Sequence, residues 1–454
     1  MKKERELFES APIPRALATL AIPTIISQLI TMIYNLADTF FIGTTNDPAK
    51  VAASSVAFVL VFAMNCLSNL FGVGGGSLIS RLLGEKRDSD ASRVSSFSFY
   101  GSIIIAAIYS FVIFFWMDEL LYLLGATDGC IGYARDYAFW VVVVGAIPST
   151  VAMTLSNLLR SEGYAKHASI GLGMGGVLNI ILDPLFMFVI LEPGNEVMGA
   201  AIATMLSNCA VLVYFLIALF LIRRKSVLSL SPAKMLPRRE HVGSVFAVGF
   251  PSALSSFLAC LSNIIINNLT SGYGDHALAA VGIVKKIDML PMNVGMGLCQ
   301  GMMPLVAYNY ASKNYKRMKG FTDAARIAGI AFAILCIVVF EIFAEPLVRV
   351  FINEPGTVAL GTDFLRIMCL AVPLMIYSFQ MSFTFQAMGM GRQSLFLSSL
   401  RQGLVNIPLL FLMNMWFGLY GIVWTQLISD SLTAVISYAF YRHSYNGLIK
   451  SVNM

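Results

Sequence analysis

Charged residues are scarce in this chain. Only 12% of its 454 residues are Asp, Glu, Lys or Arg, whereas about 25% is typical of a soluble domain. Long polar linkers are also missing between the apolar runs, which recur from near Pro14 to near Tyr441. These two shortages, with a hydrophobic content of 57%, exclude an ordinary water-soluble protein and predict an all-α integral membrane protein.

The sequence also lacks the usual signatures of enzymes and ATP-driven pumps. Its four histidines are scattered, with no HExxH spacing, and no Gly-x-Ser-x-Gly elbow occurs. The glycine cluster in residues 72–76 lacks the ending of a phosphate-binding loop, and the seven cysteines form no CxxC pair. We therefore expect no enzyme and no cofactor. An intramembrane enzyme is the weakest of the alternatives.

Apolar runs long enough to cross a bilayer, about 20 residues each, recur throughout the chain. The first is too long for the core of a signal peptide, so we expect it to be retained. The first six spans are predicted at residues 14–42, 51–83, 94–117, 133–159, 167–190 and 197–222. The second six are predicted at residues 243–270, 277–306, 321–343, 362–389, 393–416 and 419–441.

The basic residues alternate between loops in a way that fixes an orientation. Twenty-four of the 31 lysines and arginines fall before span one, after each even-numbered span, or in the linker after span six. The opposite loops hold only Lys50, Arg135 and Arg349 among several acids. By the positive-inside rule, both termini are expected in the cytoplasm of a multi-pass inner-membrane protein. The dispersed net charge of +6 argues against nucleic acid as a partner.

The two halves of the chain repeat each other weakly. Pro23 and Asn35 match Pro251 and Asn263 at an offset of 228, and the offset drifts only to 222 at the end of the repeat. The other matched positions are Lys86 with Lys313, Pro148 with Pro373, Gly163 with Gly389, Asn179 with Asn406, and Gly199 with Gly421. Because each half has six spans, the repeats are parallel and related by a pseudo-twofold axis along the membrane normal. We predict an N-terminal lobe at 1–222, a basic cytoplasmic linker at 223–242 and a C-terminal lobe at 243–454.

Two carboxyl groups fall inside predicted spans of the first half. Asp38 lies near the outer end of span one, and Asp183 lies at a similar depth in span five. Tyr34 and Asn35 precede Asp38 by about one helical turn, and Asn179 stands one turn before Asp183. Such oxygen-rich groups suit a hard cation, and the same pair of acids can hold a proton. A structural role, with each acid capping or pairing inside the bundle, is the alternative.

Two prolines lie on the same helices. Pro184 provides no amide hydrogen for the carbonyl of Ile180, and Pro23 provides none for that of Thr19. Both helices can therefore bend where the hydrogen bond is missing. We expect Pro23 and Pro184 to act as hinges when the acids load and release an ion.

The charged residues inside the second-half spans are harder to assign. Lys285, Lys286 and Asp288 interrupt span eight, and Lys285 has the spacing to pair with Asp288 one turn on. Asp430 lies in span twelve between two serines and is satisfied either by their hydroxyls or by a neighbouring helix. A substrate contact or a structural polar role is open for all four.

Two stretches resemble one transporter family. Residues 23–29 (PTIISQL) lead to residues 34–39 (YNLADT), and residues 300–304 (QGMMP) lead to residues 308–310 (YNY). Together with the span count, they make the chain similar over its whole length to the multidrug and toxic compound extrusion (MATE) family, in particular to its bacterial DinF-like branch. The resemblance implies a V-shaped antiporter that exports lipophilic or cationic compounds against inward flow of protons or sodium.

The same resemblance implies a site. The family's first-lobe ion site matches Asp38, Asn179 and Asp183, where sodium would bind, with Tyr34, Asn157 and Thr204 as further members. It also implies a monomer embedded in membrane lipid. A lipid-linked sugar flippase or polysaccharide exporter of the wider superfamily is the alternative function, which the pair of lysines in span eight favours.

Overall fold

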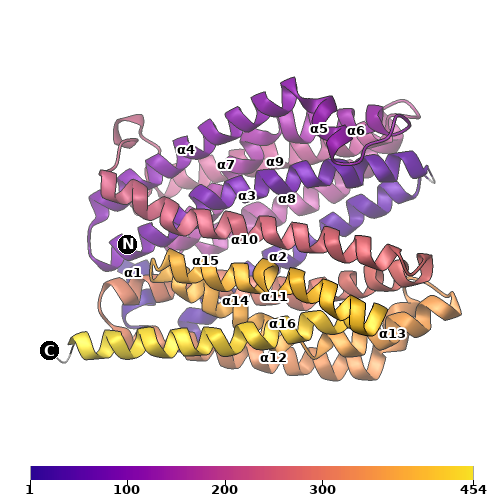
Figure 1. Ribbon diagram of the computed structural model, residues 1–454. Coiled ribbons are helices and arrows are strands. Elements are labelled where there is room, and N and C mark those ends of the chain that lie inside the picture. Colours follow the sequence, from indigo (N-terminus) through magenta and orange to yellow (C-terminus); the bar gives the residue numbers. More distant parts are fainter. Residues whose placement is uncertain (1, 46, 453–454) are drawn as a thin grey trace. The chain divides into compact units, whose positions relative to one another are not determined.

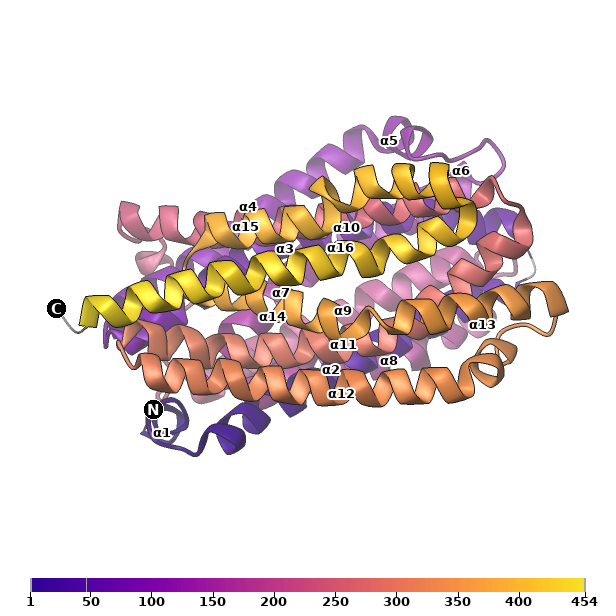
Figure 2. The same ribbon diagram turned by 60° about the horizontal axis from the view of Figure 1, so that its bottom comes forward.

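The computed structural model describes residues 2–45 and 47–452, and every regular element in that part of the chain is a helix. Apolar sequence with few charges leaves the backbone to satisfy its own hydrogen bonds, which helices do within one segment. The chain forms two compact units (Figures 1 and 2). The first comprises residues 1–10 and 26–253, and the second comprises residues 11–25 and 254–454.

The first unit holds the helices of the first predicted half, together with the start of α10 from the second half. They are α1 (Lys2–Glu9), α2 (Ile13–Gly43, shared), α3 (Pro48–Gly84), α4 (Asp88–Phe115), α5 (Met117–Leu123), α6 (Ile131–Ala138), α7 (Ala146–Ser161), α8 (Ala165–Leu185), α9 (Glu196–Ile222) and α10 (Arg239–Ser271, shared). Two π-helical segments, η1 (Phe139–Val144) and η2 (Phe186–Ile190), continue α6 and α8, and a short 3₁₀ helix, η3 (Pro232–Lys234), lies in the linker.

The second unit contains the remaining helices. They are α11 (Asp275–Ala311), α12 (Tyr315–Arg349), α13 (Pro355–Cys369), α14 (Val372–Ala387), α15 (Gly391–Ser399), the π-helical η4 (Leu400–Leu404) and α16 (Asn406–Val452). Helix α11 packs against α12 and α14, which also packs against α16 (Figure 2). Helices α13 and α14 meet at a bend of 46°, as the pair α6–η1 and α7 does at 52°.

The predicted twelve spans correspond to these helices. Eight helical segments are long and apolar enough to cross a membrane, and the two bent pairs raise that number to 10. Helix α11, which carries Lys285, Lys286 and Asp288, is not among these segments, and the segment Gly391–Leu448 consists of two helices joined at Gly418. Gly418 has φ +60°, a left-handed conformation that glycine adopts readily. The fold is an all-α bundle of twelve membrane spans.

The internal repeat is visible in the backbone of both units. Lys86 and Lys313, matched at an offset of 227, both adopt a positive φ, of 59° and 61°, just after a long helix. The matched pair Gly163 and Gly389 also has positive φ angles, of 97° and 75°. The two halves therefore turn their chains in the same way at equivalent positions.

Two helices are divided between the units at equivalent places. Helix α2 belongs to the second unit up to Ile25 and to the first from the next residue, whereas α10 belongs to the first unit up to Ala253 and then to the second. Each boundary lies two residues after a matched proline, Pro23 or Pro251. The lobe boundaries expected at residues 222 and 243 stay a prediction.

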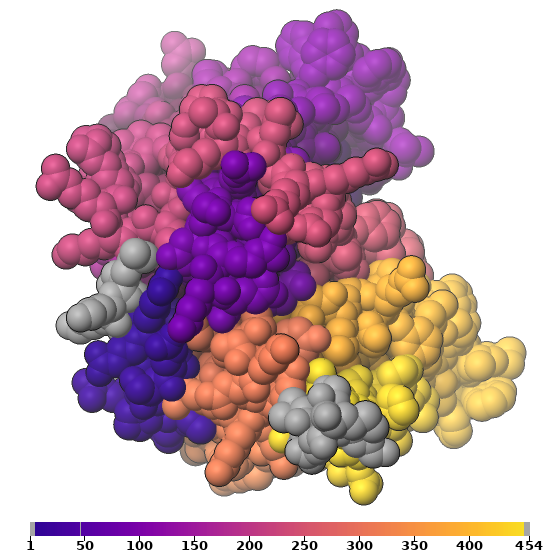
Figure 3. Space-filling model, turned by 90° about the vertical axis from the view of Figure 1, so that its left-hand side faces the viewer, coloured from indigo at the N-terminus to yellow at the C-terminus, as the bar shows by residue number. Residues whose placement is uncertain are grey.

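The linker after α9 is held to the first unit by polar contacts. The hydroxyls of Ser96 and Tyr100 on α4 donate to the carbonyls of Ser229 and Leu230, over 2.8 and 2.9 Å. At the end of α7, the carboxyl of Glu162 accepts from the amide of Val227 over 2.7 Å. Figure 3 shows a face of the molecule on which this part of the chain, in pink, lies beside purple residues from the first hundred or so of the sequence.

Candidate functional site

The candidate ion pocket lies between helices of the first unit, and small residues allow those helices to approach. A side chain at Gly176 of α8 would place its Cβ 2.8 Å from Ile30 and 3.2 Å from the ring of Tyr34, both on α2. Because glycine has no side chain there, Tyr34 lies directly against α8. This contact brings the polar face of α2 to the helix that carries Asn179 and Asp183.

Asn179 and Asp183 point to the same place on α8. The amide of Asn179 donates to Asp183 Oδ1 over 3.1 Å and to Thr204 Oγ1 of α9 over 3.2 Å. Asn179 is 2% exposed and Asp183 is fully buried. Two of the predicted companions, Asn179 and Thr204, therefore join Asp183 in one network.

Asp38 approaches this network from α2. Its charge and that of Asp183 act on each other, and both act on the hydroxyl of Tyr34. Asp38 is itself partly buried. The structure thus brings Tyr34, Asp38, Asn179 and Asp183 together with Thr204, which only the family resemblance had suggested.

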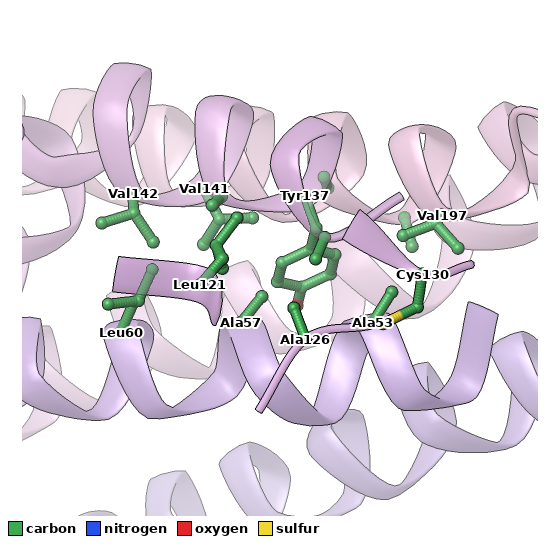
Figure 4. Packing of buried hydrophobic residues seen from close by; sticks show 14 of the residues in the cluster. Ala53, Ala57, Leu60, Leu121, Ala126, Cys130, Tyr137, Val141, Val142 and Val197 are labelled. Atoms are coloured by element: carbon green, nitrogen blue, oxygen red, sulfur yellow. The ribbon is translucent and has the colours of Figure 1, made fainter. Parts of the chain in front are cut away.

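The sequence did not identify Tyr137, which also belongs to the pocket. Its hydroxyl on α6 donates to Asp38 Oδ2 over 3.4 Å. The ring is held by apolar neighbours, and Figure 4 shows it among Ala57, Ala126 and Val141. Tyr137 lies near the outer end of predicted span four, at a depth comparable to that of Asp38, and this depth is the one signal that could have singled it out.

Three oxygens in the pocket have no hydrogen-bond donor. They are Asp38 Oδ1, Asp183 Oδ2 and Asn179 Oδ1, each buried and without a partner in the described part of the chain. An unpaired carboxylate in an apolar environment is energetically expensive. Among the residues described, no group of three or more His, Cys, Asp or Glu is placed to hold a metal. The arrangement of oxygens suits a proton or a hard monovalent cation rather than a transition metal.

Two predicted members of the site point elsewhere. Asn35 is exposed on the surface of α2, one position away from the face that carries Tyr34. The amide of Asn157 on α7 donates to the carbonyl of Met153 in its own helix, over 3.1 Å. The structure gives neither residue a hydrogen bond to Asp38 or Asp183 among the described contacts.

The charged residues of the second unit form different pairs from those that their spacing suggested. Lys285 donates to Asn267 Oδ1 of α10 over 3.1 Å, and no ion pair joins it to Asp288 in the described part of the chain. The expected pair is therefore wrong, because the side chain of Lys285 turns toward α10. Lys286 is exposed, and Asp288 is half-buried on the same helix.

Asp430 is satisfied by a neighbouring helix, one of the two options that the sequence left open. Arg401 in η4 contacts it through Nε, 2.6 Å from Oδ1, and the pair is 7% and 0% exposed. Arg401 was not among the predicted site residues, although it lies inside predicted span eleven. A basic residue inside a span requires a partner, and that rule would have identified it.

Comparison with known proteins identifies one family. The family model described as MatE matches residues 23–185 and 251–412. A multidrug export protein, MepA, from Staphylococcus saprophyticus is 32% identical over 428 residues, covering 94% of this chain and 93% of the relative. MepA from Staphylococcus aureus strain MRSA252 is 33% identical over 429 residues, with the same coverage. A solved multidrug resistance MATE transporter of the MOP superfamily, in an outward-facing conformation, superposes with a TM-score of 0.93 at 23% identity, with 99% of each chain covered.

Proposed function

We infer the mechanism of this protein from one premise: the chain belongs to the MatE family. It is a multi-pass membrane transporter, and transporters of this family are secondary transporters rather than enzymes. Its relatives of similar length are multidrug export proteins, so the transported compounds are small molecules that leave the cell.

We propose that the pocket around Asp38 and Asp183 binds the ion that drives export. One observation carries this proposal: three acceptor oxygens from two helices converge without a donor among the described residues. A bound proton or sodium ion supplies the missing positive charge, with Asp38, Asn179 and Asp183 as its first ligands. Tyr34, Thr204 and Tyr137 complete the polar surroundings, and no cofactor is needed.

The ion can change the packing of the helices that form the pocket. Helix α8 changes to the π-helical η2 two residues after Pro184, where the backbone already departs from regular α geometry. Discharging the acids removes the repulsion between α2 and α8 and favours close packing, whereas emptying the pocket favours separation. Pro23 and Pro184 are the proposed hinges for this change.

We also propose the class of exported compound, the oligomeric state and the orientation in the membrane. The exported compounds are lipophilic or cationic. The chain has 24 methionines and 32 phenylalanines, and such polarizable, flexible or aromatic side chains can bind apolar compounds of different shapes. The protein works as a monomer in the lipid of the bacterial inner membrane. Both of its ends lie in the cytoplasm, as the distribution of basic residues predicts.

The pocket is tested by dye efflux from proteoliposomes in which the pH and sodium gradients are imposed separately. We expect Asp38→Asn and Asp183→Asn each to reduce gradient-driven efflux at least tenfold, because each variant removes a charge that the ion must neutralise. Thr39→Ala is the matched control, since Thr39 is exposed on α2 and bonds only to its own helix in the described contacts. Normal efflux by correctly inserted Asp38→Asn and Asp183→Asn would refute the coupling role.

A further inference from the structure

The internal repeat gives the ion pocket a counterpart in the second half of the chain. The offset of 228 that matches Asn35 with Asn263 takes Tyr34 to Ser262. The offset of 227 takes Asn179 to Asn406, and the offset of 222 that matches Gly199 with Gly421 takes Thr204 to Gln426. Three polar positions of the first pocket therefore have polar equivalents.

The packing of two glycines supports this register independently. A Cβ at Gly199 would meet the backbone of Met187 at 2.9 Å, and one at Gly421 would meet the backbone of Met413 at 2.0 Å. Met187 and Met413 are themselves related by an offset of 226, between the values on either side. In each half, a glycine near the start of the last span packs on the equivalent methionine. Thr204 and Gln426 therefore stand at equivalent places.

One hydrogen bond repeats as well. Asn179 donates to Thr204 over 3.2 Å, and Asn406 donates to Gln426 Oε1 over 3.3 Å. Ser262, at the position of Tyr34, donates to Asn406 Oδ1 over 3.4 Å. The second half thus keeps the bond from this asparagine to the last span, while Ser262 donates to the amide oxygen that, on Asn179, has no donor among the described residues.

The two networks differ in where their acid lies and in how it is neutralised. The offset of 227 takes Asp183 to Leu410, and the acid of the second network is Asp430 on the last span. In the first half, Asp183 Oδ2 has no donor among the described residues. In the second half, Asp430 accepts from Arg401 Nε over 2.6 Å and from Gln426 Nε2 over 2.8 Å. The guanidinium also lies 4.5 Å from the ring centre of Phe379, a cation–π contact. Arg401 therefore provides within the chain the positive charge that the first pocket must take from outside.

We propose that this cluster, Ser262–Asn406–Gln426–Asp430 with Arg401, is a latent site for a monovalent cation, occupied permanently by the Arg401 guanidinium. The proposal rests on the proposed function of the first pocket. It explains why the chain retains a buried ion pair in a membrane span, where unpaired charge is expensive and a structural pair has no advantage over apolar packing. The exchangeable ion then binds in the first half alone, and removal of the arginine opens a second cation site.

A further acid, Asp288, lies near the cluster, and its effect on cation binding must be distinguished from that of Asp430. The charges of Asp430 and Arg401 both act on Asp288 of α11, which has no ion-pair partner in the described part of the chain. Lys285, the base nearest to it in sequence, binds Asn267 instead. An Asp288→Asn variant therefore tells whether a cation is held by this acid or by Asp430.

The test is chemical rescue of the purified full-length Arg401→Ala variant by guanidinium chloride at millimolar concentration, far below denaturing levels. We expect a saturable rise in its thermal unfolding temperature, because a free guanidinium ion replaces the lost side chain beside Asp430. Wild type and Arg401→Ala/Asp430→Asn should show no saturable rise, whereas Arg401→Ala/Asp288→Asn should keep it. Sodium chloride tests whether a small inorganic cation gives the same rise in unfolding temperature. Choline chloride at equal ionic strength controls for the general effect of salt. No saturable effect, or an equal effect without Asp430, would overturn the proposal.

A second variant keeps the proposal testable if Arg401→Ala yields no folded protein. The neutral pair Arg401→Met/Asp430→Asn leaves no unpaired charge, and we expect it to export dye with the ion dependence of wild type. A folded pair variant that loses ion-driven export would show that these residues exchange the ion, against the proposal. The two proposals fail separately: normal export by Asp38→Asn and Asp183→Asn refutes the first pocket alone, and absence of guanidinium rescue refutes the latent site alone.

Discussion

At the scale of single residues, Glu162 makes stability depend on pH. Its carboxyl is only 5% exposed at the end of α7, where it accepts hydrogen bonds from Ser226 and Val227 of the linker. Burial raises the pKa of Glu162 from 4.5 to about 7. The folded protein therefore keeps this proton to a higher pH than the unfolded chain does, so the free energy of unfolding falls as the pH rises through this interval.

We expect the Glu162→Gln variant to lack this dependence. The wild type should lose about 3 kcal/mol of stability between pH 4.5 and pH 7.5, since one pKa unit corresponds to about 1.4 kcal/mol. Glutamine retains an oxygen for the Val227 amide and cannot ionise, so its profile should be flatter. Thermal unfolding in detergent across this pH interval measures the difference, with Glu192→Gln in an exposed loop as the control. Parallel profiles for wild type and Glu162→Gln would contradict the assignment.

Single residues differ in how far sequence could identify them. Asp38 and Asp183 stand out because carboxyl groups are rare in apolar runs, so a simple rule finds them. Tyr137 does not, because it is one of 17 tyrosines and its role depends on the rotation of α6, which no local pattern fixes. The contact between Lys285 and Asn267 was missed for a related reason, since helical spacing describes only neighbours on the same helix.

At the scale of helices, close contact between α2 and α8 depends on Gly176. An added methyl group would lie 2.8 Å from the Ile30 side chain and 3.2 Å from the Tyr34 ring, so these side chains, or α2 with them, must shift beside Asn179 and Asp183. We expect Gly176→Ala to destabilise the protein by about 1–3 kcal/mol, as overpacking usually does, and to weaken ion-driven efflux more than tenfold. Dye efflux and thermal unfolding measure both effects.

Gly132→Ala is the matched control for this substitution. Gly132 is exposed on α6, and a Cβ there would meet nothing within 4 Å. Because alanine favours a helix more than glycine does, this variant should be neutral or slightly more stable. Equal efflux by Gly176→Ala and Gly132→Ala would mean that the approach of α2 to α8 is not needed for transport.

Helices were predictable where hydropathy alone determines them. The run at 14–42 became α2 and the run at 197–222 became α9, each within two residues. The turn at Gly418 falls in the gap predicted between spans eleven and twelve, whereas the bend at Gly145 and the π-helical segments were not foreseen, because they depend on how neighbouring helices pack. Spans four, ten and eleven are consequently broken helices, although their limits in the sequence were close.

At the scale of the whole molecule, the distribution of basic residues predicts which loops face the cytoplasm. The predicted linker at 223–242 holds six lysines and arginines, whereas the loop between α5 and α6 holds none. Positively charged loops resist translocation, so the linker should stay inside and the α5–α6 loop should be exported. The relatedness of the two halves requires the same orientation for both, since each has an even number of spans.

Two single substitutions test this orientation in intact cells. The wild-type side chain of Leu236, in the linker, is 83% exposed, and Gly129 is exposed in the α5–α6 loop. The substitutions are Leu236→Cys and Gly129→Cys. A membrane-impermeant maleimide added outside should label Gly129→Cys at once, and Leu236→Cys only after the membrane is opened. The unmodified chain provides the background, because five of its seven cysteines are buried and the other two are half-buried. Labelling of Leu236→Cys from outside would reverse the orientation, and with it the direction in which the Asp38–Asp183 pocket must load and release its ion.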